Sequence, residues 1–424
     1  MILYKGTIYE NINQSSLLET LYDDCLVTLS NVKRLQTIDV INACDKLTVK
    51  IMNGDFDDLI NPLLEEYDIP KEYYAKYVSM FNQSSLEQKV KIELGEDYTS
   101  LSSLDDSNHR ELHPLGILFH IAAGNIDVLP AYSVIEGLLV GNINILKLPT
   151  GDKGVSVKLL SELINIEPKL KEYIYVFDVA STEVETLQVF ANIADAIVVW
   201  GGDEAVKAAR RMAPINTKVI DWGHKLSFGY ASLDVSDDDL IGLANHIAST
   251  DQLLCSSAQG IFVDTDRREE LDAFAERFFT LFVEQNKKHV PVSYGMMSRN
   301  SVELYYEELV QHKTNKKVWK KDGISVITSD DNILELSLLF RNVWIKMLPN
   351  NDIIKVIKLH KSHLQSVSIM APKKKYDEYV TKFVQAGLVR IKKSDELSEV
   401  ILGESHDGMY PLRLYSRVVE IYKK

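Results

Sequence analysis

Apolar and polar positions follow different patterns in successive parts of the chain. Residues 1–113 are mostly polar, with apolar residues at helical intervals in Thr37–Asn53 and Lys71–Phe81. This pattern predicts a helical N-terminal segment that packs on the domain after it. Two polar runs, residues 82–85 and 99–103, predict loops within the segment.

From residue 114 to residue 225, short runs of branched and aromatic residues alternate with segments of helical periodicity. The predicted strands are residues 116–121, 143–147, 173–178, 196–200 and 218–221. The predicted helices are residues 129–140, 153–164, 182–191 and 203–212. Alternation with short connections is typical of a parallel sheet covered on both faces. We therefore expect an α/β fold whose residues 114–225 form a Rossmann-like, doubly wound domain.

After residue 225 the pattern predicts a second α/β domain, residues 226–400, and a C-terminal strand segment, residues 401–424. Strands are expected at residues 260–264, 324–328, 343–348, 366–370, 388–391 and 417–422. Helices are expected at residues 237–250, 267–287, 302–312, 352–360 and 374–386.

Composition narrows the class of protein and of partner. The chain has 424 residues, of which 46% are hydrophobic and 25% charged, as in soluble globular proteins. A net charge of −14 argues against nucleic acid as the main partner. We expect no membrane span and no leader segment, and three cysteines without paired spacing favour a cytoplasmic location. His360 and His363 have no further ligands at a recognised spacing, so no metal site is expected.

Candidate binding residues follow the predicted strands of the doubly wound domain, where ligands of such sheets bind. These residues are Lys147, Thr150, Gly201, Gly202, Trp222 and Gly223. A glycine pair before a helix lets backbone N–H groups approach a pyrophosphate, and a lysine can reach a ribose hydroxyl or a phosphate. The Gly-x-Gly-x-x-Gly fingerprint is absent, so each turn alone is also compatible with ordinary turn chemistry.

The candidate nucleophile is Cys255. It lies between a predicted helix and a predicted strand, and small polar residues follow it, so that a substrate can approach its sulfur. A thiolate is a strong nucleophile and a good leaving group, which suits acyl transfer. The alternative is a buried structural thiol, because free cysteine behaves as a small hydrophobic residue.

Several segments, taken in order, resemble a known superfamily. Residues 124–125, 141–147, 221–225 and 252–255 are similar to successive landmarks of the aldehyde dehydrogenases. Within that superfamily, His120–Asn125, Gly137–Asn142 and Cys255–Gln259 resemble the acyl-CoA reductase family, which includes the LuxC-like fatty-acid reductases of bacterial bioluminescence. The similarity covers residues 114–264, some third of the chain.

The resemblance implies roles for individual residues. Cys255 matches the nucleophile that carries the acyl group, and Asn125 matches the amide that stabilises the oxyanion together with the Cys255 N–H. Lys147 matches the lysine on the adenosine ribose, and Gly201–Gly202 the turn under the pyrophosphate. Asp221 stands where oxidising aldehyde dehydrogenases have a glutamate base, and its side chain is one methylene shorter than glutamate. The alternative role of Asp221 is a cap or a salt bridge at a strand end.

The resemblance also implies the reaction. We expect an NADPH-dependent acyl-CoA reductase that converts a fatty acyl thioester into an aldehyde through an acyl-cysteine intermediate. Thr150 stands where NAD-preferring relatives often have an acid, so NADPH is permitted, with NADH as the alternative. Alternative functions are aldehyde oxidation with NAD(P)+ and Asp221 as base, acyl-phosphate reduction, and a non-catalytic scaffold.

Partners follow from the same resemblance. The acyl donor is expected to be a CoA thioester or an acyl carrier, and an acyl-protein synthetase is a further candidate partner. A homo-oligomer is expected, in which the strand at residues 417–422 either pairs across a subunit boundary or is a simple edge strand.

Overall fold

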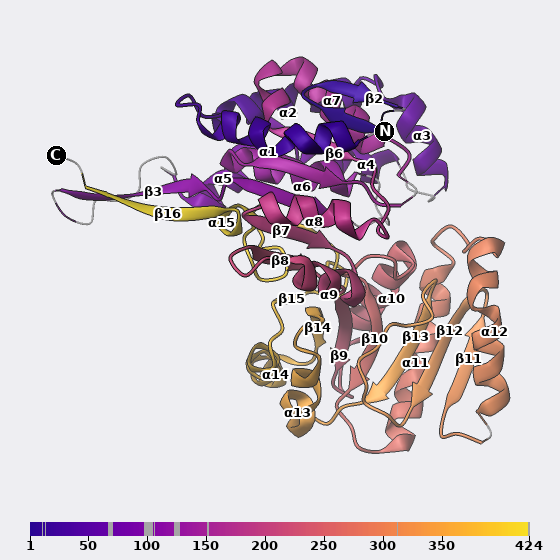
Figure 1. Cartoon of the computed structure of the whole chain (residues 1–424). Coiled ribbons are helices and arrows are strands. Elements are labelled where there is room, and N and C mark those ends of the chain that lie inside the picture. Colours follow the sequence, from indigo (N-terminus) through magenta and orange to yellow (C-terminus); the bar gives the residue numbers. More distant parts are fainter. Residues whose placement is uncertain are drawn as a thin grey trace. The chain divides into compact units, whose positions relative to one another are not determined.

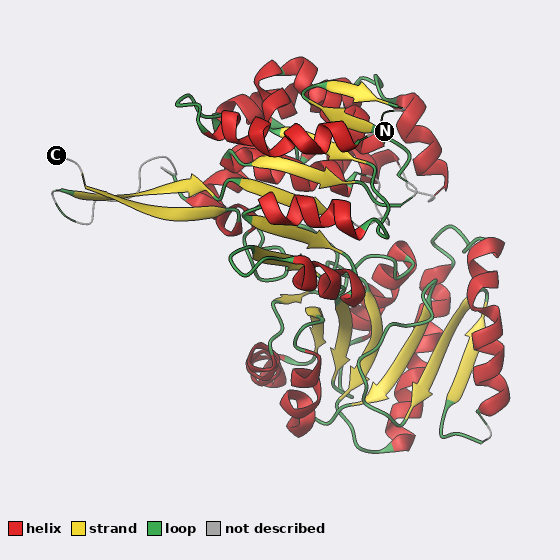
Figure 2. Ribbon diagram, viewed as in Figure 1, coloured by secondary structure: helices red, strands yellow, loops and turns green. Residues whose placement is uncertain are grey.

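The computed structural model describes residues 1–10, 12, 14–66, 71–96, 105, 107–122, 128–150, 152–311 and 313–422. They form two compact units (Figures 1 and 2). The first contains Met1–Gly223 together with Ile401–Lys424, and the second contains His224–Val400. Each unit is built around its own seven-stranded sheet.

The sheet of the first unit confirms the predicted doubly wound arrangement. Its parallel strands are β4 (Ile117–Ile121), β5 (Ile143–Lys147), β6 (Ile174–Phe177), β7 (Ala196–Trp200) and β8 (Lys218–Trp222). They lie in the order β6-β5-β4-β7-β8. The strand order reverses direction between β4 and β7, which is where ligands of such sheets bind.

Four helices connect these strands: α6 (Leu129–Val140), α7 (Val155–Ile166), α8 (Val184–Ile193) and α9 (Asp203–Met212). With right-handed crossovers, α6 and α7 cover one face of the sheet and α8 and α9 the other. Every residue of β5 and β7 is buried, as expected for strands covered on both faces. Helix α6 has Pro130 in its first turn, where a missing N–H is tolerated. Its C-cap is Gly141, whose φ of 90° lies in the left-handed region that glycine adopts most readily.

The N-terminal segment contains helices, as predicted, and also two strands that were not predicted. Its helices are α1 (Ser15–Leu29), α2 (Thr37–Met52), α3 (Asp57–Glu66), α4 (Lys71–Ser79) and α5 (Gln83–Leu94). Strand β1 (Ile2–Tyr4) pairs antiparallel with β6, and β2 (Thr7–Tyr9) pairs with β1. The first residues thus extend the sheet, because their apolar side chains are buried at its edge.

The predicted loop at residues 82–85 is wrong. Asn82 is the N-cap of α5, and its side chain accepts a hydrogen bond from the Ser85 N–H at 2.8 Å. The polar run is therefore a helix start, where such residues satisfy free backbone N–H groups. The predicted loop at residues 99–103 lies outside the described residues.

The last strand of the chain returns to the first unit. Strand β16 (Ser416–Tyr422) follows the short helix α15 (Pro411–Leu414) and pairs antiparallel with β3 (Asn108–Pro114), forming a two-stranded ribbon (Figure 1). Fully buried Tyr415 anchors this ribbon, since its carbonyl oxygen accepts hydrogen bonds from the Leu115 N–H and the Asn142 side chain.

The second unit confirms the predicted second α/β domain. Its strands are β9 (Leu226–Ala231), β10 (Ala258–Val263), β11 (Lys317–Lys321), β12 (Ile324–Ser329), β13 (Asn342–Met347), β14 (Leu364–Met370) and β15 (Arg390–Lys392). They lie in the order β11-β12-β13-β10-β9-β14-β15, and only the edge strand β11 is antiparallel to its neighbour. Strands β9 and β11 were not predicted.

The helices of this unit are α10 (Asp237–Thr250), α11 (Arg268–Asn286), α12 (Tyr294–Val310), α13 (Ile353–Ile357) and α14 (Lys373–Ala386). Helix α12 starts earlier than predicted, because the Ser293 side chain caps it by accepting from the Met296 N–H. The helix predicted at residues 352–360 is α13 flanked by two short 3-10 turns. Within the described part of the chain, every helix is too short or too polar to cross a bilayer.

Candidate active site

Of the three cysteines in the sequence, Cys255 alone is exposed. Burial raises the pKa of both Cys25 and Cys44 to about 12, so these two thiols stay protonated and act as core residues. Cys255 lies in the loop that joins α10 to β10, at the edge of the second sheet where the parallel strands begin. Its exposure does not fit the alternative of a buried structural thiol.

The loop that carries Cys255 starts with two residues in the left-handed region. Helix α10 ends at Thr250, and Asp251 and Gln252 have φ values of 47° and 63°. Non-glycine residues in this region cost free energy and persist only where the surroundings hold them. Here the Arg341 Nε donates to the Asp251 carboxylate at 2.6 Å, and the Phe340 N–H donates to the Asp251 carbonyl oxygen at 2.9 Å.

The two ends of the Cys255 loop are linked by a pair of buried glutamines. The Gln252 Nε2 donates to the carbonyl oxygens of Ala258 and Gln259, both at 3.1 Å. In return, the Gln259 Nε2 donates to the carbonyl oxygens of Gln252 and Ser257, both at 3.2 Å. These bonds satisfy backbone groups that the loop leaves unpaired, so they fix the backbone on both sides of Cys255.

Two side chains from neighbouring strands contact Cys255 itself. The Ser227 hydroxyl, on β9, donates to the Cys255 carbonyl oxygen at 2.8 Å. The Gln365 Nε2, on β14, donates to the Cys255 Sγ at 3.4 Å. Sequence reasoning missed both residues, because β9 was not predicted and the strand predicted at residues 366–370 began one position after Gln365.

The first unit contains the predicted nucleotide-binding residues, beginning with Lys147 at the end of β5. Its side chain is buried, and the Nζ donates to the Ser181 hydroxyl at 3.2 Å. Burial lowers the pKa of Lys147, and the nearby Asp178 opposes this effect. Thr150 follows three residues later and is exposed. An ammonium group held beside a hydroxyl at a strand end suits a ligand rich in hydroxyl or phosphate oxygens.

Gly201 and Gly202 join β7 to α9, next to the point where the strand order reverses. Gly202 is the N-cap of α9 and, as a glycine, offers no side-chain cap of its own. A Cβ added to Gly202 meets no atom within 4 Å, so the backbone here borders open space. N–H groups at a helix start attract anions, although Asp203 in the first turn adds a negative charge.

Trp222 and Gly223 follow the last strand of this sheet. The Trp222 indole is buried and packs against Trp200 at a centroid distance of 5.5 Å. The His406 ring packs edge-on against Trp222 at 4.9 Å. The Trp222 side chain is thus part of the buried core of the first unit. Gly223 is the first residue after β8, at the carboxyl edge of the sheet.

Asp221 forms a salt bridge. Its carboxylate accepts from an Arg210 guanidinium nitrogen of α9 at 2.7 Å. This contact corresponds to the structural alternative for Asp221, a salt bridge at a strand end. Asn125, the predicted oxyanion donor, lies outside the described residues.

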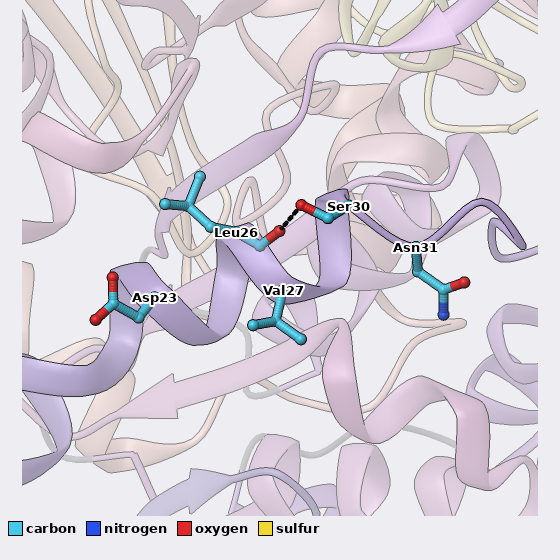
Figure 3. Close-up of a pocket in the computed structure, with 5 residues that line it drawn as sticks. All are labelled: Asp23, Leu26, Val27, Ser30 and Asn31. Carbon is cyan, nitrogen blue, oxygen red and sulfur yellow. Dashed lines mark hydrogen bonds between the residues drawn. The ribbon is translucent and has the colours of Figure 1, made fainter.

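The described residues also form a surface hollow in the first unit. A hollow on the surface of α1 is lined by Asp23, Leu26, Val27, Ser30 and Asn31, and the Ser30 hydroxyl there donates to the Leu26 carbonyl oxygen (Figure 3). None of the predicted site residues lines it. In the part of the chain that the structure describes, no group of three or more His, Cys, Asp or Glu side chains is placed to hold a metal ion.

Comparison with known proteins identifies the family. A model of the acyl-CoA reductase (LuxC) family matches residues 32–418. The chain is 26% identical over 363 residues to a long-chain acyl-protein thioester reductase of Aliivibrio fischeri, and the match covers 81% of this chain and 72% of that relative.

Solved structures of aldehyde dehydrogenases share the fold. A betaine aldehyde dehydrogenase of Staphylococcus aureus matches 96% of this chain and 88% of its own, with a TM-score of 0.70 and 13% identity. A glyceraldehyde-3-phosphate dehydrogenase of Methanocaldococcus jannaschii, complexed with NADP, matches 99% and 97%, with a TM-score of 0.68 and 13% identity. Because the family match covers most of the chain, the protein belongs to the acyl-CoA reductase (LuxC) family and has the α/β fold of the aldehyde dehydrogenases.

Proposed function

We propose that this protein is a fatty acyl thioester reductase in which Cys255 carries the acyl group. The family and the named relatives support fatty acyl reductase activity. The observation that carries the proposal is the placement of Cys255, an exposed residue on a loop whose backbone is held from both ends. A nucleophile needs this combination of access and fixed position.

The chemistry assigned to Cys255 has two parts. The thiolate attacks the carbonyl carbon of the incoming thioester, the bond from that carbon to the donor sulfur breaks, and the donor leaves as a thiolate that takes up a proton. The acyl group is then bound to Cys255 through a new thioester bond. When the aldehyde forms, this bond breaks and Cys255 leaves as a thiolate, ready for another acyl group.

The oxyanion that forms at the acyl carbonyl needs fixed hydrogen-bond donors. We assign this role to the Asn125 side chain and the Cys255 N–H. Removing one donor of this kind lowers the rate about a hundred- to a thousand-fold. Asn125→Ala is therefore expected to fall in that range while nucleotide binding is retained, and an unchanged turnover removes Asn125 from the site.

The reductant is proposed to be NADPH, with NADH as the alternative. A reduced nicotinamide, when bound, supplies the hydride that converts the acyl carbon to an aldehyde. Lys147 is assigned to the ribose and Gly201–Gly202 to the pyrophosphate, with Trp222–Gly223 bordering the same edge. The open space beside Gly202 and the buried Lys147 stem support this assignment. Exposed Thr150 adds no negative charge that repels a 2′-phosphate.

The direction of the reaction is proposed to be reduction. Oxidation to an acid needs a general base that activates water for hydrolysis of the acyl-cysteine. The candidate base, Asp221, is paired with Arg210 at 2.7 Å, and its side chain is shorter than that of glutamate. The salt bridge therefore supports a structural role for Asp221 and disfavours the oxidative alternative.

The acyl donor is proposed to be a CoA thioester or an acyl group carried on a protein. The Aliivibrio fischeri relative is named for an acyl-protein substrate, so an acyl-protein synthetase is the partner to test first. We also propose a cytoplasmic homo-oligomer in which the β3–β16 ribbon contacts a second subunit, because Val418 and Tyr422 on this ribbon are exposed.

The test combines mass spectrometry with nicotinamide absorbance. Incubation with a long-chain acyl-CoA is expected to add one acyl mass to the intact protein and none to Cys255→Ala. NADPH oxidation is expected only when the acyl donor is present. Aldehyde-dependent reduction of NADP+ without CoA supports the oxidative alternative. No acyl adduct and no nucleotide binding leave only the scaffold.

A further inference from the structure

A buried amide contacts the sulfur to which the acyl group is assigned. The Gln365 Nε2 donates to the Cys255 Sγ at 3.4 Å, and the Gln365 side chain is only 7% exposed. We propose that Gln365 is a further catalytic residue of the reaction proposed above, on which this inference rests, and that its amide N–H stabilises the thiolate form of Cys255.

Ser227 holds the backbone beside Gln365 and the backbone of Cys255 close together. Its hydroxyl donates to the Cys255 carbonyl oxygen at 2.8 Å. The same Oγ accepts the N–H of Ser366, the residue after Gln365, at 3.2 Å. Fully buried Ser227 therefore positions Gln365 and Cys255 relative to each other, with the Gln365 NH2 group toward the sulfur. Only the donor side of an amide stabilises an anion.

An irregularity in the sheet directs Gln365 toward this position. Strand β14 pairs with β9 at Leu364–Leu226 and next at Val367–Phe228, so β14 has one more residue than β9 between the two pairs. Two residues of β14, Gln365 and Ser366, therefore lie opposite one residue of β9, Ser227. Bulges of this kind change the direction of a side chain and occur next to active sites.

The neighbouring strand on the other side of β9 has a similar irregularity. Strand β10 shifts register against β9 between Ala258 and Ile261. Both shifts occur near the starts of these parallel strands, at the edge of the sheet where the Cys255 loop lies. The sheet is thus distorted on both sides of Ser227, whose hydroxyl contacts the Ser366 N–H and the Cys255 carbonyl oxygen.

A neutral donor suits the two parts that Cys255 plays. The thiolate is both the attacking form and the leaving form of the sulfur, and a hydrogen bond to the charged form favours it. The amide carries no proton that titrates and no charge that attracts a competing carboxylate. Gln365 therefore favours the thiolate in both parts of the reaction, and no proton is transferred to or from it.

The proposal is tested by the pH dependence of Cys255 alkylation. Iodoacetamide labelling is followed by intact mass between about pH 5 and pH 10, a range that brackets ordinary and activated thiols. Gln365→Leu removes the donor and is expected to move the midpoint upward by about one pH unit, a tenfold change in the thiolate equilibrium. Gln365→Glu keeps the shape but replaces the donor with a carboxylate oxygen, so its midpoint is expected to rise further.

The chain offers a matched control. Gln285, on α11 of the same unit, has the same 7% exposure, and its side chain accepts from Lys288. Gln285→Leu is expected to keep the wild-type midpoint. Circular dichroism checks that each variant has the native fold.

The outcomes separate this inference from the proposed function. Native-like Gln365→Leu and Gln365→Glu proteins with the wild-type midpoint overturn the role of Gln365, even if acyl-CoA still acylates Cys255. If neither variant folds, Ser227→Ala replaces them. It retains the amide but removes the hydroxyl that fixes the backbone beside it, so a smaller upward shift supports the proposal and an unchanged midpoint overturns it. Absence of any acyl adduct on wild-type Cys255 overturns the proposed function instead.

Discussion

The ammonium group of Lys89 lies 3.0 Å from a carboxylate oxygen of Glu136, inside the first unit. The same group lies 2.5 Å from Glu93, and both glutamate side chains are only 1% exposed. The Leu412 N–H donates to Glu93 at 2.8 Å, so this buried cluster connects α5, α6 and α15. One lysine thus balances two buried carboxylates that belong to separate segments of the chain.

Removing this lysine is expected to destabilise the protein strongly. Lys89→Met leaves the two carboxylates buried without a counter-charge, a change that costs about 3–5 kcal/mol. Burial raises the pKa of Glu93, so at low pH its carboxyl takes up a proton and the variant has one uncompensated buried charge less. The loss is therefore expected to be smaller at about pH 5 than at about pH 8. Urea unfolding at both pH values measures it. Lys207→Met, which breaks an exposed salt bridge with Glu204, is the control and is expected to change nothing measurable.

The glutamine pair around Cys255 leads to a second prediction. Gln259→Met is expected to leave the carbonyl oxygens of Gln252 and Ser257, and the Ser337 groups that donate to Gln259, without partners. Each unsatisfied buried group costs about 1–3 kcal/mol. We expect a loss of at least about 2 kcal/mol in urea unfolding and slower acylation of Cys255. If the Gln259→Met protein is as stable as the wild type and is acylated at the same rate, the glutamine pair does not fix the backbone around Cys255.

Burial of the His120 side chain leads to a third prediction, that the protein loses stability at low pH. The Trp200 Nε1 donates to the Ser133 hydroxyl at 2.9 Å. This hydroxyl lies 2.7 Å from the His120 Nδ1, and the Asn144 Oδ1 lies 3.0 Å from the Nε2. This arrangement fits a neutral ring with its proton on Nε2. Burial lowers the pKa of His120 from 6.5 to about 4.

The sign of the effect follows from the lowered pKa. In the unfolded chain His120 takes up a proton near pH 6.5, whereas in the folded protein it does so only near pH 4. The contribution of neutral His120 to the free energy of unfolding is therefore complete above pH 6.5 and is lost as the pH falls toward 4. The loss from His120 is about 2 kcal/mol at about pH 5. His120→Gln is expected to be less stable than the wild type at neutral pH but to lose less between pH 7 and about pH 5. Parallel pH profiles of unfolding free energy for the two proteins contradict this assignment.

Replacement by alanine is expected to destabilise the protein more at Gly260 than at Gly202. A Cβ on Gly260 lies 2.0 Å from the Trp344 ring, so Gly260→Ala forces the ring or the strand to move and costs about 1–3 kcal/mol. Gly202 has a φ of −71°, which alanine adopts freely, and no neighbour within 4 Å of the added Cβ. Gly202→Ala is expected to cost less than about 1 kcal/mol.

Nucleotide binding is expected to reverse this order. An added methyl group at Gly202 fills the open space assigned to the pyrophosphate, so Gly202→Ala weakens NADPH binding, while Gly260→Ala, in the other unit, leaves it intact. Nicotinamide fluorescence titrations and thermal unfolding of both variants measure the two effects. Equal NADPH affinity for wild type and Gly202→Ala removes Gly202 from the nucleotide site.

The sequence predicted the buried parallel strands well, because strands covered on both faces are continuous apolar runs, as in Ile143–Lys147 and Ala196–Trp200. Strand β9 was missed because Ser227 and Gly229 interrupt its apolar run. Gly229 does not break the strand: a Cβ there lies 2.8 Å from the Leu243 side chain, so the glycine makes room for a helix. Such a requirement exists only in the packed structure.

The site was predictable to the extent that its chemistry is local. Cys255 and the glycines at strand ends are identified by neighbours in the sequence. Gln365 is not, because its contact with Cys255 depends on a bulge between two strands whose pairing no local pattern reveals. For Asp221 the sequence left two alternatives, a catalytic base or a structural contact, and the position of Arg210 on the preceding helix, α9, shows that a salt bridge forms.

The pairing of β3 with β16 has a consequence for biosynthesis. The Arg417 side chain donates to the Pro114 carbonyl oxygen in this ribbon, and the two residues are 303 positions apart in the chain. The second unit lies entirely between them as an insertion, so a ribosome completes it before the first unit receives its final strand. Until then β3 presents unpaired backbone groups of the kind that invite aggregation. Strand β3 therefore stays unpaired until β16 is synthesised, and deletion of Ser416–Tyr422 is expected to leave it unpaired in the folded protein.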